Sequence, residues 1–234
     1  MGKNLIQQKR GKGSPTYRND NFRSPGSVKL EKNSGNAEII DIIHSNAHTA
    51  PLFVLSYEDG SFGLSVAGEG LKVGDLLEIG DEAPYKIGSS LKLRDIPEGT
   101  PVYNIELVPG DGGKFVRSSG VAARVVGKSS SKVTLKLPSK KTKDFHPECV
   151  ATIGLVAGSG RVDKPFMKAG NKFKAMKASS KYWPSVSGAS MNAVDHPFGC
   201  KRSSRKGRPT IAPKNAPPGR KVGMIRPKHT GRNK

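Results

Sequence analysis

Three short stretches of the sequence carry residue types that could do chemistry, and the first could hold a phosphate. Gly127, Lys128 and Ser129 have the Gly-Lys-Ser ending of a nucleotide-binding loop. That motif needs a glycine five residues before its Gly-Lys pair and a helix after it. This chain has Ala122 at that position, and a strand-like run follows. We therefore interpret the stretch as a turn between two strands.

The second stretch has the residue types of a zinc site. His146 and Cys149 are separated by two residues, and His196 and Cys200 could complete a tetrahedral set. Structural zinc sites usually consist of two tight ligand pairs, whereas here the first pair is loose and there is no good second pair. We expect separate structural residues, with no metal and no other cofactor.

The third stretch places Asp195 beside His196, which suggests a hydrolase if one of the many serines were a nucleophile. However, the chain has no G-x-S-x-G nucleophile elbow and little apolar support nearby to hold a triad rigid. Contact with RNA is a better use, because Asn192, Asp195 and His196 offer donors, acceptors and a ring that can stack on a base. Gly188 and Gly199 would let the backbone approach closely. We expect no catalytic residue.

The charge of the chain lies at its two ends. Its 234 residues include 40 Lys plus Arg and 19 Asp plus Glu, a formal net charge of +21. Residues 1–32 have a net charge of +6, residues 33–160 of −2 and residues 161–234 of +17. Neutralising phosphates releases counterions, so this pattern favours a nucleic-acid partner. We predict a folded body with two cationic arms.

Membrane and secreted classes fit the sequence poorly. The basic residues are interspersed with Gly, Pro and Ser, which does not suit an amphipathic membrane helix, and no run approaches the ~18 apolar residues of a membrane span. The N-terminus lacks the apolar core of a signal peptide, and two distant cysteines form no disulfide framework. We expect a cytoplasmic protein without a membrane partner.

The middle of the chain has the pattern of an all-β protein. Turn signals recur about every eight to twelve residues, and Val133, Leu135 and Leu137 alternate with polar residues. This spacing predicts two small barrels in series. We expect strands within residues 37–45, 48–60, 61–68, 71–80, 101–120, 121–141 and 148–158.

The ends have no such pattern. Residues 1–32 show neither helical nor strand period, and residues 168–180 form the one plausible helix. Residues 161–234 cannot bury enough apolar surface to order alone. Aromatic residues among the cations provide stacking platforms: Tyr17, Phe22, Tyr182, Trp183 and Phe198. The alternative is a solvated basic tail without fixed structure.

Six segments stand in collinear order over essentially the whole chain: GKGSPTYR, LRDIPEGTPVYNIELVPGDGGKFVRSSG at 93–120, KVTLKLPS at 132–139, ATIGLVAG at 151–158, MNAVDHPFG at 191–199 and GRKVGMIRPKHTGR at 219–232. Together they resemble the universal large-subunit ribosomal protein L2 family in its archaeal and eukaryotic form. The chain departs from the family pattern at Ala193, usually Pro, and at Gly199, Cys200 and Lys201, usually a Gly-Gly-Gly run.

The resemblance implies an OB-fold barrel followed by an SH3-like barrel, with long irregular basic N- and C-terminal extensions. We expect a basic N-terminal arm at 1–32, the OB-fold domain at 33–88, the SH3-like barrel domain at 89–167 and a basic C-terminal extension at 168–234. It also implies a structural constituent of the large ribosomal subunit, a primary rRNA binder that supports subunit association, tRNA binding and the peptidyl-transferase centre. The loop carrying His196 approaches that centre in the family.

The implied partners are large-subunit rRNA, neighbouring ribosomal proteins, and small-subunit rRNA at the subunit interface. The cationic arms and the resemblance together assign rRNA contacts to a set of basic residues with a few aromatic and polar ones. The set is Lys3, Arg10, Lys12, Tyr17, Arg18, Arg23, Lys114, Arg117, Lys168, Lys172, Lys174, Lys181, Trp183, Asn192, Asp195, His196, Lys201, Arg202, Arg205, Lys206, Arg208, Arg220, Lys221, Arg226, Lys228 and Arg232.

Two other functions are compatible with the residues. His196 could act as a general base, since an imidazole titrates near neutrality, but the sequence supplies no evident orienting partner, pocket or oxyanion site. A factor that binds subunits transiently would have the same charge pattern as a permanent component.

Overall fold

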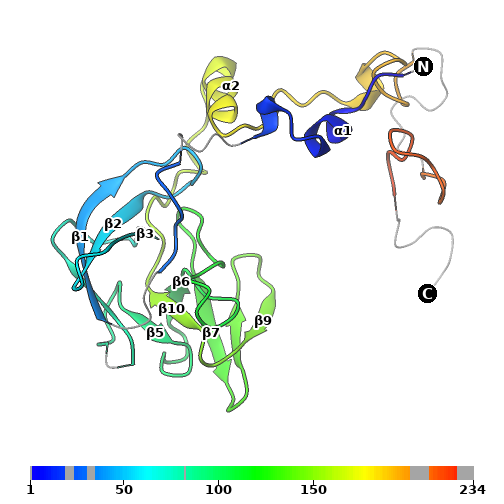
Figure 1. Ribbon diagram of the computed structural model, residues 1–234. Helices are drawn as coiled ribbons and strands as arrows, with labels where there is room; N and C mark the ends of the chain where they lie inside the picture. The colour runs from blue at the N-terminus through cyan, green and yellow to red at the C-terminus, as the bar shows by residue number, and fades with distance from the viewer. Residues whose placement is uncertain (1, 19–23, 31–34, 82, 201–210, 226–234) are drawn as a thin grey trace. The chain divides into compact units, whose positions relative to one another are not determined.

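The computed structural model describes residues 2–18, 24–30, 35–81, 83–200 and 211–225 (Figure 1). The chain separates into two compact units, which we call the body, residues 20–165, and the terminal unit, residues 1–19 and 166–234. The all-β fold class is confirmed in the body, whose ten named strands form one sheet in the order β3-β2-β1-β4-β5-β10-β6-β7-β8-β9.

The first half of the sheet is an antiparallel set with short connections. It comprises β1 (Gly35–Ile43), β2 (Leu52–Tyr57), β3 (Phe62–Val66) and β4 (Leu76–Ile79). The turn between β2 and β3 is the one that Asp59-Gly60 indicates, since Gly60 has a φ of +78° and the Ser61 N–H donates to the Asp59 carboxylate over 3.1 Å. The backbone of Lys29 donates to Leu64 of β3 over 2.9 Å, so this stretch before β1 packs on the body.

The second half contains β5 (Ser90–Lys92), β6 (Pro101–Tyr103), β7 (Ala123–Lys128), β8 (Val133–Lys136), β9 (Thr142–Phe145) and β10 (Val150–Ile153). A single parallel pairing, Ile79 with Ser90, joins β4 to β5. The last strand, β10, lies between β5 and β6. The division of the body at residue 88 remains a prediction, because the strands on both sides of it belong to one sheet.

Apolar side chains of the strands form the core of the body. The alternation at 133–137 is confirmed, since Val133 and Leu135 are fully buried and Leu137 packs against the same cluster. Tyr103 of β6 belongs to a second cluster with Leu52 and other residues of the first half. Burial of this kind is the main source of folding stability, so the body carries its own driving force.

Three expectations about strands were wrong. Of residues 71–80 only Leu76–Ile79 is a strand, because residues 72–75 form a turn in which the Lys72 N–H donates to the Asp75 carboxylate over 2.9 Å. Strands β5 and β9 were not expected, because each contains a single apolar residue, Leu91 or Phe145, and one apolar residue shows no period. Residues 101–120 hold one strand, β6, and only the isolated bridge between Ile105 and Phe115 after it.

A buried carboxylate explains why residues 106–113 are not a simple hairpin turn. Glu106 is fully buried, and its Oε2 accepts the backbone N–H of Gly110 over 3.1 Å and of Val150 over 2.9 Å. Its Oε1 accepts the Gly112 N–H over 3.0 Å, and Gly112 has a φ of +77°. The loop therefore closes around a side chain and not through a strand pairing.

The described residues of the terminal unit form short helices and irregular segments. They are α1 (Ile6–Gly11), the 3-10 turn η1 (Pro15–Tyr17), α2 (Ala169–Ala178) and the 3-10 turn η3 (Gly188–Ser190). Helix α2 confirms the helix expected over 168–180, whereas α1 corrects the view that residues 1–32 lack helix. Its six residues are too few to show a period, and the Leu5 N–H donates to Gln8 Oε1 over 2.8 Å in its first turn.

Very little apolar surface is buried in the terminal unit. Among its described residues, Leu5 and Ala212 are the buried hydrophobic side chains. Within the described part of the chain no helix is both long and apolar enough to cross a membrane.

Candidate nucleic-acid interface

The boundary between the two units is also a boundary in charge. The body contains 18 Lys plus Arg and 18 Asp plus Glu. The terminal unit contains 22 Lys plus Arg and one acidic residue, Asp195, so it carries the whole net charge of +21. This unit is the part of the molecule that a polyanion would bind most strongly.

Within the terminal unit the N-terminal segment contacts the loop at residues 191–199. The Lys3 N–H donates to the Val194 carbonyl over 2.8 Å. The Lys3 ammonium also lies 3.6 Å from Asp195 Oδ1. The N-terminal segment is thus attached to the loop at residues 191–199, and the arms are not independent extended tails.

The loop at residues 191–199 is held by its own backbone. The Asn192 carbonyl accepts the N–H groups of Asp195 and His196 over 3.0 and 3.1 Å, and the His196 carbonyl accepts the Gly199 N–H over 2.9 Å. A Cβ on Gly199 would collide with the Asn192 carbonyl, and one on Gly188 would collide with the His196 ring. Both glycines therefore serve close approach, as their positions in the sequence indicate.

The environment of His196 fixes its chemical state. The Phe198 N–H donates to His196 Nδ1 over 3.0 Å. The centroids of the two rings are 5.0 Å apart, and the ring planes are tilted by 59°. In a neutral imidazole one nitrogen accepts and the other carries the proton, so the proton is on Nε2. Burial lowers the pKa of His196 from its ordinary value. The residue therefore presents a neutral N–H donor.

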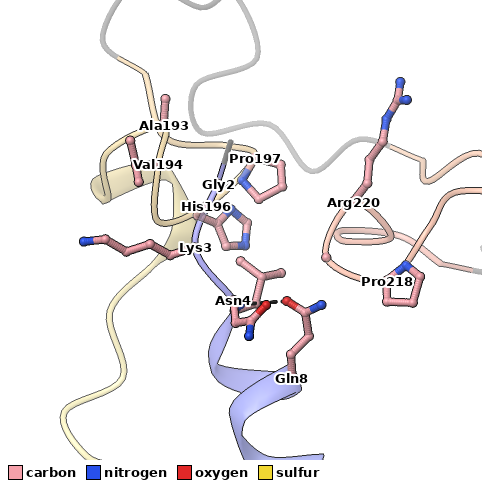
Figure 2. A pocket seen from close by; sticks show the side chains of 12 residues that line it. Gly2, Lys3, Asn4, Gln8, Ala193, Val194, His196, Pro197, Pro218 and Arg220 are labelled. Atoms are coloured by element: carbon pink, nitrogen blue, oxygen red, sulfur yellow. Dashed lines mark hydrogen bonds between the residues drawn. The ribbon is translucent and has the colours of Figure 1, made fainter.

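Figure 2 shows a pocket of about 350 Å³ beside this ring. His196 and Pro197 line it from the loop, Asn4 and Gln8 from the N-terminal segment, and Arg220 from the C-terminal segment. Amides, a cation and an imidazole N–H are groups that bind phosphate, ribose and base edges.

Comparison with known proteins identifies the family. A family model described as "Ribosomal Proteins L2, C-terminal domain" matches residues 86–219. The chain belongs to the ribosomal protein L2 family. A protein of Archaeoglobus fulgidus named "Large ribosomal subunit protein uL2" is 48% identical over 234 residues, covering 99% of both chains.

Two further archaeal relatives with the same printed name support the assignment. The protein of Methanocaldococcus jannaschii is 48% identical over 99% of both chains, and that of Methanothermobacter thermautotrophicus is 45% identical over the full length of both. The expected resemblance is confirmed. The body accordingly has the OB-fold barrel and SH3-like barrel of the L2 family.

The rRNA-contact residues expected in this L2-family chain are only partly brought together. Three of them belong to the loop at residues 191–199, namely Asn192, Asp195 and His196. Two others, Lys3 and Arg220, line the pocket beside it. Arg10 lies over the Tyr17 ring at 6.0 Å, and Lys172 over the Trp183 ring at 5.6 Å. The remaining described members of the terminal unit have no contact that links them to this loop: Lys12, Arg18, Lys168, Lys174, Lys181 and Lys221.

Of the expected residues that the structure describes, two lie in the body. Arg117 donates to the carbonyls of Val28 and Gly113 over 2.6 and 2.8 Å, so its guanidinium is used inside the protein. The Lys114 ammonium lies 3.8 Å from Asp111 Oδ2, so this cation forms an ion pair within the body. The other expected residues fall outside the described part of the chain: Arg23, Lys201, Arg202, Arg205, Lys206, Arg208, Arg226, Lys228 and Arg232.

The structure also locates the two other motifs. The Ser129 N–H donates to the Lys132 carbonyl over 2.8 Å. This bond confirms a turn between β7 and β8 in place of a phosphate-binding loop. Cys149 is buried, and this burial raises the pKa of its thiol to about 11. No three metal-ligating side chains gather anywhere among the described residues.

Sequence reasoning missed the contribution of Asn4, Lys9 and Gln8, which line pockets against the loop. They lie more than 180 residues from it in the chain. No local pattern could have paired them with it.

Proposed function

We propose that this chain is a structural constituent of the large ribosomal subunit and binds rRNA chiefly through its terminal unit. The observation that carries the proposal is the partition of charge, with 22 cations and one carboxylate in the terminal unit and equal numbers in the body. Since that unit buries so few apolar residues, rRNA would supply the contacts that order it.

The proposal extends to the partners and place of action of the family. In it the chain contacts large-subunit rRNA, neighbouring ribosomal proteins, and small-subunit rRNA at the subunit interface, within cytoplasmic ribosomes. The loop at residues 191–199 supports the architecture of the peptidyl-transferase centre, and with it tRNA binding and subunit association.

The role of His196 in this proposal is to donate a hydrogen bond, and the chain is not an enzyme. A general base needs a free lone pair, but Nδ1 accepts the Phe198 N–H and Nε2 then carries the proton. An Nε2–H group suits an rRNA phosphate, a ribose hydroxyl or a base carbonyl.

Washing ribosomes in high salt tests the structural role. We expect one copy of the chain per large subunit to remain, because arms enclosed by RNA are not released when phosphate contacts weaken. Release to well below one copy would contradict the proposal and favour a transient factor.

A His196→Ala variant separates placement from catalysis. Defective assembly or a modest loss of rate is expected. A loss of roughly 10² or more in peptide-bond formation by normally assembled subunits would instead indicate general-base chemistry.

A further inference from the structure

A groove lies between the N-terminal segment and residues 182–196 of the terminal unit, next to the pocket in Figure 2, with which it shares Lys3, Asn4, Leu5 and His196. It consists of two pockets of about 350 and 320 Å³. The volumes are in the range of small-molecule sites. The two pockets share five lining residues: Ile6, Tyr182, Val186, Met191 and Asp195.

The apolar part of this groove includes the aromatic ring of Tyr182. Tyr182 is half-buried, and no hydrogen bond or ring contact joins its side chain to another described residue. The neighbouring Trp183 differs, because the Lys172 ammonium lies over its ring. Tyr182 therefore has a face on which a flat ligand could stack, with Ile6 and Met191 as further apolar contacts.

Cations also line the groove. Lys3 and Lys9 line one pocket and Arg10 lines the other. An aromatic ring and apolar side chains close to cations fit a base with its phosphates. They fit a peptide side chain less well, since the surrounding cationic unit would repel cationic proteins.

Asp195 sets the specificity of the groove. It is the one acidic residue of a unit with 22 cations, and a carboxylate there opposes phosphate binding. Its ion pair with Lys3 uses Oδ1 at 3.6 Å, and a carboxylate has about four lone-pair positions. It can therefore still accept N–H groups from the edge of a base, and guanine offers two parallel N–H donors.

We propose that this groove binds one unpaired guanine nucleotide of rRNA, with its base stacked on Tyr182 and its N1–H and N2–H groups donating to Asp195. Lys3, Lys9 and Arg10 contact the flanking phosphates. The inference rests on the proposed rRNA binding and adds a specific ligand to it.

Ultraviolet cross-linking of salt-washed large subunits tests the proposal without any variant. Trypsin cleaves after Lys181, so the peptide that carries Tyr182 and Asp195 begins at Tyr182. Mass spectrometry should detect a guanosine monophosphate adduct on Tyr182. No RNA adduct on this peptide, an adduct of another base, or a link to another protein would overturn the proposal.

Kethoxal, which modifies N1 and N2 of unpaired guanine, supplies the second measurement. Subunits with the wild-type chain or Tyr182→Phe should protect one guanine that becomes reactive with Tyr182→Leu and with Asp195→Asn. Phe173→Leu, an aromatic change on α2 outside the groove, should keep the protection. Unchanged protection in Asp195→Asn would overturn the role of the carboxylate.

The number of copies of the chain per large subunit separates failure of the guanine site from failure of the proposed ribosomal role. One chain per subunit without the guanine contact overturns this inference alone. Failure of the wild-type chain to remain on salt-washed subunits overturns the proposed function and the inference together.

Discussion

The body and the terminal unit differ in charge balance and in how much apolar surface they bury. The body balances 18 cations with 18 carboxylates and contains three clusters of buried apolar residues. The terminal unit has 22 cations, one carboxylate and two buried hydrophobic residues among those described. The difference indicates that the body folds on apolar burial, whereas the terminal unit is completed by a polyanion.

The two regions also use their cations differently. In the body, Lys92 pairs with Asp81 over 2.8 Å and with Glu148 over 3.2 Å, and the hydrogen bond from Lys92 lowers the pKa of Asp81. In the terminal unit, the described residues form one ion pair, Lys3 with Asp195. The other described cations of this unit form no ion pair with a described carboxylate.

The largest effect should come from the apolar core of the body. Leu135→Ala removes a fully buried side chain and should lower the free energy of unfolding by roughly 2–5 kcal/mol. Met167→Ala in the terminal unit, where the side chain is 84% exposed, should leave it within about 0.5 kcal/mol. Urea denaturation of the isolated chain measures both. Equal losses would refute the division of stability between the units.

Glu106→Gln should have the next largest effect. The amide nitrogen of Gln cannot accept a hydrogen bond, so at least one buried N–H loses its acceptor, at a cost of about 1–3 kcal/mol. Glu98→Gln is the matched control, because this exposed side chain can still accept the Lys128 N–H with its remaining oxygen. If both variants unfold at the same urea concentration, the buried carboxylate does not hold its loop.

Particular residues show which features could be predicted from the sequence alone. Alternation revealed the strand at 133–137, and charge revealed the arms, since both signals are local in the chain. Glu106 was not recognised, because its acceptor role depends on Val150, 44 residues away. The groove was not recognised either, since Ile6 and Lys9 meet Tyr182 only after folding. Its stacking residue was visible only as one of several aromatics among cations.

Lys3→Ala should change the terminal unit and leave the body unaffected. The ion pair is exposed, with 70% and 41% of its two side chains accessible, and such pairs contribute less than about 1 kcal/mol. We expect faster hydrogen exchange at the His196 N–H and an unchanged urea midpoint. Lys177→Ala on α2 should alter neither. A shift of the midpoint in Lys3→Ala would mean that the two units unfold together.

The smallest effect should be a dependence of the His196 loop on pH. Burial lowers the pKa of folded His196 below its ordinary 6.5, so the unfolded loop binds protons more readily. The contribution to stability is full above pH 6.5 and is lost as the pH falls through the folded value. Exchange at the Phe198 N–H, corrected for its intrinsic rate, should rise over that range.

His196→Asn provides the control for this titration. Its side-chain oxygen can accept the Phe198 N–H but does not titrate, so the pH dependence should disappear. Its persistence in the variant would assign the effect to another group.

The position of β10 in the sheet has a consequence for biosynthesis. This strand is the last of the body to leave the translating ribosome, yet it lies between β5 and β6. The sheet therefore cannot be continuous from β5 to β6 until residues 150–153 have emerged. Lys3 emerges first but meets Val194 and Asp195 only near the end of synthesis, so the nascent N-terminus spends most of translation as an unaccompanied cationic peptide.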